Sequence, residues 1–346
     1  MHTERFHKLA VGTLIILIII WIFSSRPNEN VIMRLILSKI KLYIEGIWFM
    51  IFSKDSKGLG PKSNPDPKLI EGKKTFTKRI IFLRHGESDW NDVFNKGFGP
   101  SFIFRLISAW FRELKLFHTK DSIFLDSPLN EEGFVQAKEL GRFLVEESEK
   151  GVPTAEIILG KRETSIVTSS NLRRAISTTT IAMWPRINST KEKIAILSCL
   201  QEISRNVDTK ALSENQSIPV LDRIANHIED GNEFIPEHIF NATENKGNKT
   251  TGFNGIKRLK AFNEWAFTRE ESTIIVGGHS LWFKHFFATF LPFDCDHDAK
   301  KKKLVNSGVV SFILHRHQDE SSKFGPVSYR IDPASIETVY GGFTSK

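Results

Sequence analysis

The chain has 346 residues, of which 40% are hydrophobic and 25% charged, a balance that is ordinary for a folded protein with one large domain. Its two cysteines, Cys199 and Cys295, are too few for a disulfide framework or a thiolate metal site, so both classes are excluded. The net charge of +8 is concentrated in residues 1–78, which hold 13 Lys and Arg against 6 Asp and Glu, so it suits an anionic membrane surface better than a nucleic acid.

The first element is an uncharged run of 15 residues from Leu9 to Phe23. As a helix it would be about 22 Å long, which is short of the roughly 30 Å hydrocarbon core of a bilayer. Both a cleaved signal peptide and an uncleaved anchor fit that length. Trp21 and Phe23 stand where a signal peptidase needs small residues, so we expect residues 1–30 to form a hydrophobic helix that anchors the chain.

An amphipathic helix is predicted next, over residues 31–52. Its apolar residues recur at helical spacing, with Arg34, Lys41 and Glu45 between them. Two placements stay open, one in the plane of a membrane interface and one packed on the folded domain. Residues 53–75 are rich in Gly, Pro and Lys and predict a linker, which places the folded domain at residues 76–346.

Within that domain, strands alternate with helices. Apolar runs predict strands at residues 79–83, 165–168, 194–197, 273–276 and 309–314, and helical patterns lie between them at residues 130–149 and 171–184. This alternation predicts an α/β fold of three layers, α/β/α, around a mainly parallel central sheet.

Three of the predicted strands end in residues that suit a phosphate group. Arg84 and His85 follow the first strand, Arg173 and Arg174 follow the second, and His279 follows the fourth. Because the carboxyl ends of parallel strands meet at one edge of a sheet, we expect these side chains to share a crevice. Guanidinium groups match phosphate oxygens, and a neutral histidine near pH 7 suits a nucleophile. The second histidine would then be charged and donate to the phosphoryl group.

These segments resemble the histidine phosphatase superfamily, also called the phosphoglycerate mutase-like branch. Residues 83–91 (LRHGESDWN) are similar to the signature of that family, and residues 127–137, 169–175 and 277–280 follow in the family's order. The resemblance covers about residues 78–315, with unmatched insertions near 92–125 and 206–269. It implies a phosphoglycerate mutase-like fold whose chemistry needs no cofactor and no metal ion.

The resemblance also implies roles for individual residues. His85 matches the nucleophile that becomes phosphohistidine, and Arg84, Arg174 and His279 match the phosphate pocket. Asn91 matches a further residue that contacts the phosphate.

The same resemblance implies a proton donor and roles for the charged residues near it. Glu202 stands where the family places the carboxyl group that protonates the leaving oxygen, and Asp208 is the alternative. Arg174 is preferred to Arg173 because the family's arginine directly precedes an alanine, so we expect Arg173 on a solvated helix surface. Glu87 is expected to be structural, because its charge would oppose a bound phosphate.

One departure from the family favours hydrolysis. Mutases of this family follow their acidic residue with an arginine and a tyrosine that hold the substrate carboxylate, whereas Ile203, Ser204 and Arg205 stand here. We therefore expect a phosphatase that hydrolyses a phosphomonoester, either a small molecule or a phosphoprotein. The alternatives are a mutase-type phosphoryl transferase and a catalytically silent, membrane-tethered adaptor that binds phosphate.

Three further stretches have open interpretations. The aromatic helical pattern at residues 102–117 predicts either a helix packed on the rim of the site or a lid that touches a membrane. The acidic residues at 294–298 and the lysines after them are expected to form a solvated loop. Four sequons, at Asn188, Asn215, Asn241 and Asn248, favour a lumenal domain, whereas basic residues after the anchor favour a cytoplasmic one, so the side of the membrane and the oligomeric state stay open.

Overall fold

A computed structural model of the chain describes residues 31–60, 74–221, 223–229, 234–250, 252, 254–318 and 327–345. The predicted anchor at residues 1–30 lies outside these ranges. Among the helices that are described, none is both long enough and apolar enough to span a bilayer.

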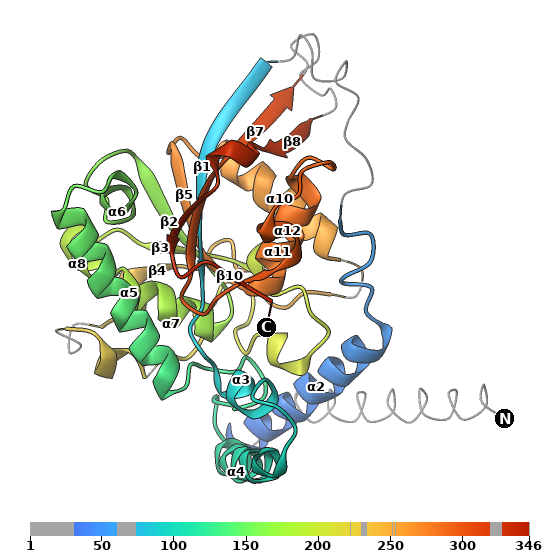
Figure 1. Cartoon of the computed structure of the whole chain (residues 1–346). Coiled ribbons are helices and arrows are strands. Elements are labelled where there is room, and N and C mark those ends of the chain that lie inside the picture. The colour runs from blue at the N-terminus through green and yellow to red at the C-terminus, as the bar shows by residue number, and fades with distance from the viewer. Residues whose placement is uncertain are drawn as a thin grey trace.

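The described residues form a central sheet of eight strands (Figure 1). The strands are β1 (Lys74–Arg84), β2 (Ser165–Ser170), β3 (Ile194–Leu197), β4 (Phe240–Asn241), β5 (Thr273–Gly278), β7 (Val309–Gln318), β8 (Ser328–Ile331) and β9 (Glu337–Tyr340). In the order β4-β3-β2-β5-β1 all neighbours are parallel, whereas β7 joins β1 in the antiparallel sense, and β8 and β9 pair with β7. The prediction of an α/β fold with a mainly parallel sheet is confirmed, and all five predicted strands occur.

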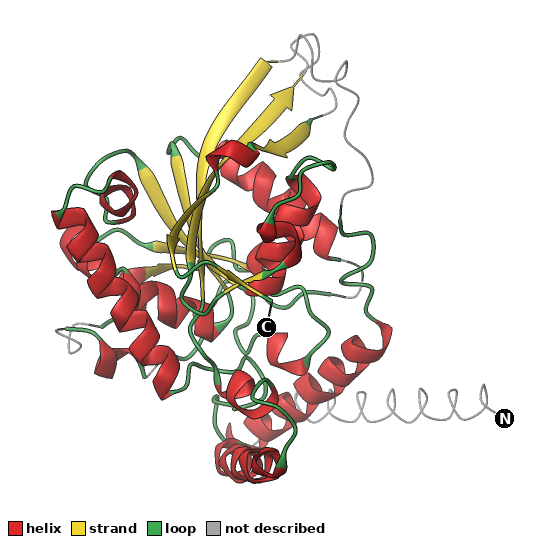
Figure 2. Ribbon diagram, in the orientation of Figure 1, coloured by secondary structure: helices red, strands yellow, loops and turns green. Residues whose placement is uncertain are grey.

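Helices cover both faces of this sheet (Figure 2). The helices are α2 (Val31–Phe52), α3 (Asp89–Phe94), α4 (Pro100–Leu116), α5 (Glu131–Glu149), α6 (Pro153–Ile158), α7 (Arg173–Ala182), α8 (Trp184–Thr190), α9 (Pro236–Ile239), α10 (Gly255–Thr268), α11 (Ser280–Phe290) and α12 (Asp298–Lys301). Helices α5 to α8 lie on one side and α10 to α12 on the other, and a short pair, β6 (Lys303–Leu304) with β10 (Phe343–Thr344), lies beside α11.

The directions of the β1 side chains explain why residues 80–83 are all apolar. Successive side chains of a strand point to opposite faces, so Ile80 and Phe82 enter one core while Ile81 and Leu83 enter the other. The first core contains Trp282 and Phe286 of α11. Because both faces of the sheet are covered, neither set of side chains can be polar.

Helix α2 has the predicted bounds and packs on the folded domain, which is one of its two predicted placements. Phe49 is buried, and Gly46 lies against Val207 of the short 3₁₀ helix η3 (Val207–Thr209). Asp55 follows α2 and is also buried. The first residues of the predicted linker therefore belong to the packed domain.

Candidate active site

Strand β1 fixes Arg84 and His85 at the centre of the sheet. It pairs with β5 on one side and with β7 on the other, and the His85 backbone N–H donates to the Gly278 carbonyl at 3.0 Å. Gly86 follows because the chain approaches the start of α5 closely at this point. A Cβ atom on Gly86 would lie 2.6 Å from the Gly133 carbonyl oxygen, so no other residue fits without a shift.

The His85 ring is buried and oriented by its neighbours. Its Nδ1 lies 2.6 Å from the Gly86 carbonyl oxygen, which assigns the proton to Nδ1 and leaves a lone pair on Nε2. Arg174 Nε donates to that Nε2 at 3.3 Å. Burial, followed by the charges of Arg174 and Arg84, holds the pKa of His85 well below its usual range. The ring is therefore neutral at pH 7, as a nucleophile requires.

His279 lies at the end of β5 and faces His85. The two ring centroids are 5.1 Å apart, and His279 Nε2 is 2.9 Å from the Ser170 hydroxyl at the end of β2. Burial, followed by the charge of Arg174, lowers the pKa of His279 well below its usual range. The expectation of a charged second histidine is therefore wrong for these surroundings, although a dianion bound between the rings would raise the pKa of His279.

The two predicted arginines of the phosphate pocket are both deep in the domain. Arg174 donates from Nη1 to the Asp208 carbonyl at 3.0 Å, and its Nη2 lies 3.2 Å from Asp208 Oδ2 and 3.4 Å from Glu202 Oε2. Arg84 donates from Nη1 to the Leu304 carbonyl at 2.5 Å. Burial lowers the pKa of Arg84 to about 10, so this guanidinium remains charged at pH 7.

The carboxyl groups of both candidate proton donors, Glu202 and Asp208, lie beside the Arg174 guanidinium. Glu202 Oε1 accepts from the Leu281 backbone N–H at 3.1 Å, in the first turn of α11, and its Oε2 lies 3.4 Å from His279 Nδ1. Asp208 is also buried, and burial with the nearby charge of Glu202 raises the pKa of Asp208 to about 6 against the opposing effect of Arg174. Asp208 is thus protonated in part near neutral pH.

Three polar atoms in this group of side chains have no hydrogen-bond partner among the described residues. They are Arg84 Nε, His279 Nδ1 and Asp208 Oδ1. Buried polar atoms are nearly always paired, so unpaired ones beside two arginines suit a polar ligand.

Asn91 is not brought into contact with this group by any interaction between described residues. It lies in α3, where its Oδ1 accepts from Asn95 Nδ2 at 3.0 Å and its backbone N–H donates to the Ser88 cap at 3.3 Å. The role that the resemblance implies for Asn91 stays a prediction.

Arg173 was expected on a solvated surface, and that prediction is wrong. Its side chain is buried, its Nε donates to the Asp126 carbonyl at 2.9 Å, and it forms an ion pair with Asp121. Asp126 also accepts from the Arg173 backbone N–H at 2.8 Å. The reason is the segment after α4, which folds over the start of α7 and brings the carboxylates of Asp121 and Asp126 to Arg173.

A buried charged cluster behind Glu202 was missed by sequence reasoning. Lys249 Nζ donates to the carbonyls of Glu202 and Ser204 at 2.5 and 2.6 Å, and Arg258 Nη2 donates to the Glu202 carbonyl at 3.3 Å. Asp55 pairs with both, at 3.1 Å from Lys249 Nζ and 2.8 Å from Arg258 Nη1, and burial lowers the pKa of Lys249 to about 7. Each of these residues is a single charge in a polar stretch, so no local pattern marks the cluster.

His85, Glu202 and His279 also have the spacing of a metal site, since their ligand atoms all lie within 4.8 Å of one another. The surroundings do not suit a cation, because Arg174 Nε lies 3.3 Å from His85 Nε2 and Arg84 adds a second positive charge. The acidic loop at residues 294–298 has its own partners, with Asp296 paired to Lys301 and Asp298 to Lys302.

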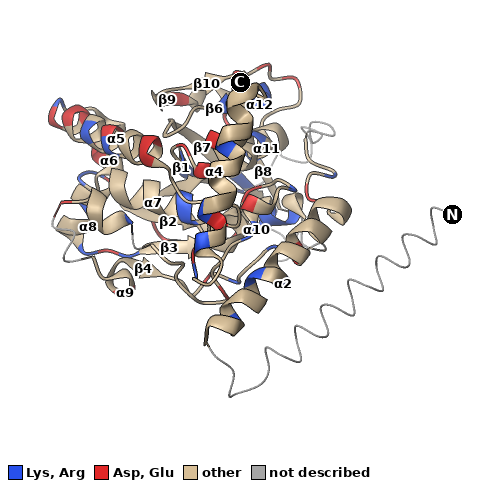
Figure 3. Cartoon of the chain, turned by 90° about the horizontal axis from the view of Figure 1, so that it is seen from below, with Lys and Arg blue, Asp and Glu red and all other residues tan. Residues whose placement is uncertain are grey.

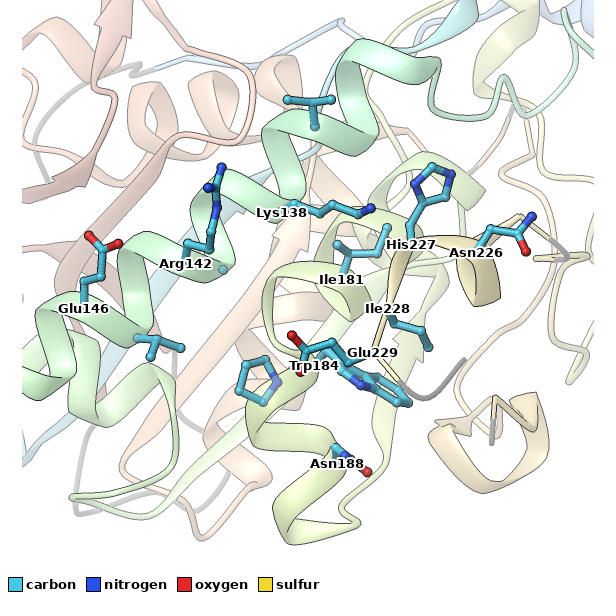
Figure 4. A pocket seen from close by; sticks show the side chains of 14 residues that line it. Lys138, Arg142, Glu146, Ile181, Trp184, Asn188, Asn226, His227, Ile228 and Glu229 are labelled. Carbon is cyan, nitrogen blue, oxygen red and sulfur yellow. The ribbon is translucent and has the colours of Figure 1, made fainter. Parts of the chain in front are cut away.

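A separate hollow of about 880 Å³ lies between α5, α8 and residues 226–229 (Figure 4). Lys138, Arg142, Glu146 and Glu229 line it, so positive and negative groups are mixed there. The residues lining this hollow include none of the predicted site residues.

No known family model and no curated protein matches the sequence. Solved structures do match it, 62 chains in all, and named phosphatases are among them. Mycobacterial hydrolase 2 is 16% identical with a TM-score of 0.37, and the match covers 77% of this chain and 91% of that one. The mycobacterial glucosyl-3-phosphoglycerate phosphatase in complex with VO3 is 14% identical with a TM-score of 0.36, over 74% of this chain and 97% of that one. The product of open reading frame Rv3214 of Mycobacterium tuberculosis is 12% identical with a TM-score of 0.35, over 78% and 99%.

Proposed function

We propose that the protein is a phosphomonoesterase of the histidine phosphatase type, with the phosphoglycerate mutase-like fold, and that His85 is its nucleophile. One observation carries the proposal. His85 and His279 face each other with ring centroids 5.1 Å apart, and Arg174 Nε lies 3.3 Å from His85 Nε2. A phosphoryl group between the rings would meet a nucleophilic nitrogen, a second ring nitrogen and a guanidinium at once.

In the first step the phosphate oxygens bind Arg174 and Arg84, and Arg174 turns from His85 to its ligand. His85 Nε2 then attacks phosphorus, forming a P–N bond as the P–O bond to the leaving group breaks. A carboxyl group gives its proton to the leaving oxygen, and the product alcohol departs. The Gly86 carbonyl stabilises the positive charge on the ring through the Nδ1 proton.

In the second step water hydrolyses the phosphohistidine. The carboxylate that gave up its proton now takes one from the attacking water, the P–N bond breaks, and inorganic phosphate leaves with neutral His85 restored. Arg84, which stays charged at pH 7, stabilises the developing charge on the phosphoryl oxygens.

Glu202 is our proposed proton donor, and Asp208 is the second candidate because its pKa is raised to about 6. Two variants distinguish them, Glu202→Gln and Asp208→Asn. Loss of the true donor should slow phenyl phosphate, whose leaving group needs a proton, far more than 4-nitrophenyl phosphate, whose leaving group does not. If only Asp208→Asn shows this selective loss, the donor is Asp208.

The surroundings of Glu202 support hydrolysis rather than mutase activity. Ile203 follows it and is buried in the apolar core, so its side chain offers nothing to a substrate carboxylate. A mutase remains the enzymatic alternative, and labelled phosphate that moves to a sugar acid instead of water would favour it. A silent adaptor is the other alternative, but binding alone does not require an oriented nucleophile.

We further propose that residues 1–30 anchor the protein to a membrane by a single pass, with a phosphorylated small molecule or phosphoprotein as substrate. Support comes from the uncharged run at Leu9 to Phe23 and from the basic excess of residues 1–78. We expect no nucleic acid partner.

The experiment that tests the catalytic proposal traps the intermediate. The full chain is mixed with an aryl phosphate labelled on phosphorus and then quenched, and the protein should carry phosphate that is labile in acid and stable in alkali. His85→Ala should lose both this label and turnover, whereas His238→Ala, which changes an exposed histidine, should keep both. Unchanged turnover in His85→Ala would refute the mechanism.

A further inference from the structure

Helices α2 and α4 lie at the same end of the molecule (Figure 3), and both carry exposed large apolar side chains. On α4, Phe104, Trp110 and Phe111 are 74%, 56% and 63% exposed. On α2, Trp48 and Ile51 are 42% and 50% exposed. We call these residues, together with Ile107, the α2–α4 surface.

Most of this surface is not the face by which α4 packs on the domain, although the Trp110 ring also lies beside Phe124, with centroids 5.8 Å apart. That face consists of Ala109 and Glu113, which are buried, and of Phe102 and Leu106, which pack beside Val93. Glu113 Oε2 accepts from the Ile123 backbone N–H at 2.6 Å, so the inner face is fully engaged. Helix α4 therefore carries a second apolar face, and a helix that is apolar on both sides is normally covered on both.

The two helices form one unit. Tyr43 of α2 donates to Glu113 Oε1 of α4 at 2.8 Å, and the Tyr43 ring stacks on Phe117 with centroids 6.5 Å apart. The Lys39 ammonium donates to the Leu116 carbonyl. These contacts fix α2 and α4 relative to each other.

We propose that the α2–α4 surface docks onto a lipid bilayer with anionic headgroups. The chain itself supplies the reason, because only seven residues separate the uncharged run that ends at Phe23 from the start of α2 at Val31. Fully extended, seven residues span about 25 Å, so a membrane that holds the run lies within reach of α2. Tryptophan and phenylalanine suit the interface between headgroups and acyl chains. On α2 and just after it, the exposed basic residues Arg34, Lys41, Lys54 and Lys57 match anionic lipid.

Docking of the α2–α4 surface orients the candidate site relative to the bilayer. Both helices lie at the end of the sheet where β1 delivers His85, and α2 lies against Val207, next to Asp208 (Figure 1). A bilayer on the α2–α4 surface therefore faces the carboxyl end of the sheet. This goes beyond the proposed anchor, which tethers the chain but does not orient the domain.

The test measures whether Trp110 enters lipid. The full chain is reconstituted into vesicles of phosphatidylcholine and phosphatidylserine at a ratio of 4:1, with and without brominated acyl chains, which quench tryptophan at close range. The chain contains 7 tryptophans, so Trp110→Phe isolates the signal of Trp110 by difference. We expect the Trp110 component to be quenched at least twofold and that of Trp265, isolated in the same way, to be unchanged.

A matched pair of charge variants completes the test. Phe104→Glu combined with Phe111→Glu should abolish quenching of Trp110, whereas Val135→Glu, at an exposed apolar position on α5, should leave it intact. Hydrolysis of 4-nitrophenyl phosphate is measured on the same variants as a check, separate from lipid docking, that the domain is folded and the candidate site is intact. This hydrolysis should persist in the double variant and in Val135→Glu.

Each remaining outcome overturns the docking proposal. If the chain sediments with the vesicles while Trp110 stays unquenched, the chain is anchored but the α2–α4 surface does not dock. If the chain does not sediment with the vesicles, it is neither anchored nor docked. Quenching that survives the double variant places another surface on the lipid. A dimer that the double variant dissociates, without quenching, assigns the surface to a second copy of the chain.

Discussion

The candidate site and the α2–α4 surface depart from ordinary burial in opposite directions. In the site, charge is buried, since Arg174 and Glu202 are 1% and 7% exposed. On the surface, apolar area is exposed, since Phe104 is 74% exposed. Buried charge must be paired, as Arg174 is with Glu202 and Asp208, and large apolar groups are normally covered. The two proposals therefore assign each region a ligand of its own chemistry, a dianion in one case and a bilayer in the other.

The two regions also differ in how they are built. The α2–α4 surface comes from turns of two continuous helices, whereas the site gathers residues from the ends of three strands and from a loop. They are joined where α2 and the residues after it pack on the domain. Asp55 follows α2 closely in the chain, and it pairs with Lys249 and Arg258, which hold the backbone of Glu202.

The largest expected effect comes from removing Asp55, the residue that joins the two regions. Asp55→Ala leaves the buried Arg258 guanidinium without its paired carboxylate, so we expect the free energy of unfolding to fall by about 3–5 kcal/mol. Urea denaturation measures this change. Asp296→Ala, which removes the exposed partner of Lys301, should leave the midpoint unchanged. A similar small effect of both substitutions would mean that the Asp55 cluster does not hold the site.

The next effect concerns the buried charge of the site itself. Arg174→Lys keeps a positive charge but loses the planar fork that matches phosphate oxygens, so we expect kcat/KM for 4-nitrophenyl phosphate to fall on the order of 100-fold or more. Steady-state kinetics measures it. Arg223→Lys, at a partly exposed arginine paired with Glu131, is the matched control and should change little. Wild-type activity in Arg174→Lys would remove Arg174 from the phosphate pocket.

The pH dependence of stability provides a third test. The pKa of His85 is lowered in the folded protein, so its contribution to stability is present above the usual histidine pKa and is lost as pH falls below about 6.5, where the unfolded chain binds the proton first. His85→Asn should therefore reduce the loss of stability between pH 6.5 and 5 by on the order of 1 kcal/mol per pH unit. Urea midpoints across this range measure it, with the exposed His238→Asn as control. An unchanged slope would mean that His85 already binds a proton in the folded state.

The smallest expected effect is on the apolar surface in the absence of lipid. Phe104→Ala removes an exposed ring, so we expect the free energy of unfolding in lipid-free solution to change by less than about 0.5 kcal/mol. Phe134→Ala, the same change at a buried position of α5, should cost about 3–5 kcal/mol. Thermal or urea unfolding compares the two. A large loss in Phe104→Ala would show that another part of the chain, such as residues 9–23, already covers the surface.

Several features followed from the sequence because they depend on neighbours along the chain. The apolar run Ile80 to Leu83 predicts a buried strand, and helical spacing predicts α2 with the bounds that it has. The grouping of His85, Arg174 and His279 also followed, because parallel strands bring their carboxyl ends to one edge. The short edge strands β4, β8 and β9 did not, since two to four residues carry too little periodicity.

Tertiary structure alone decided the rest, because these features depend on which distant segments meet. Arg173 is buried because the segment after α4 returns two carboxylates to it, and the pKa of His279 is lowered because burial and then the charge of Arg174 disfavour its proton. The cluster of Asp55, Lys249 and Arg258 joins positions about 200 residues apart. Local composition cannot encode such contacts, since a single charge looks the same in solvent as in a core until the chain has folded around it.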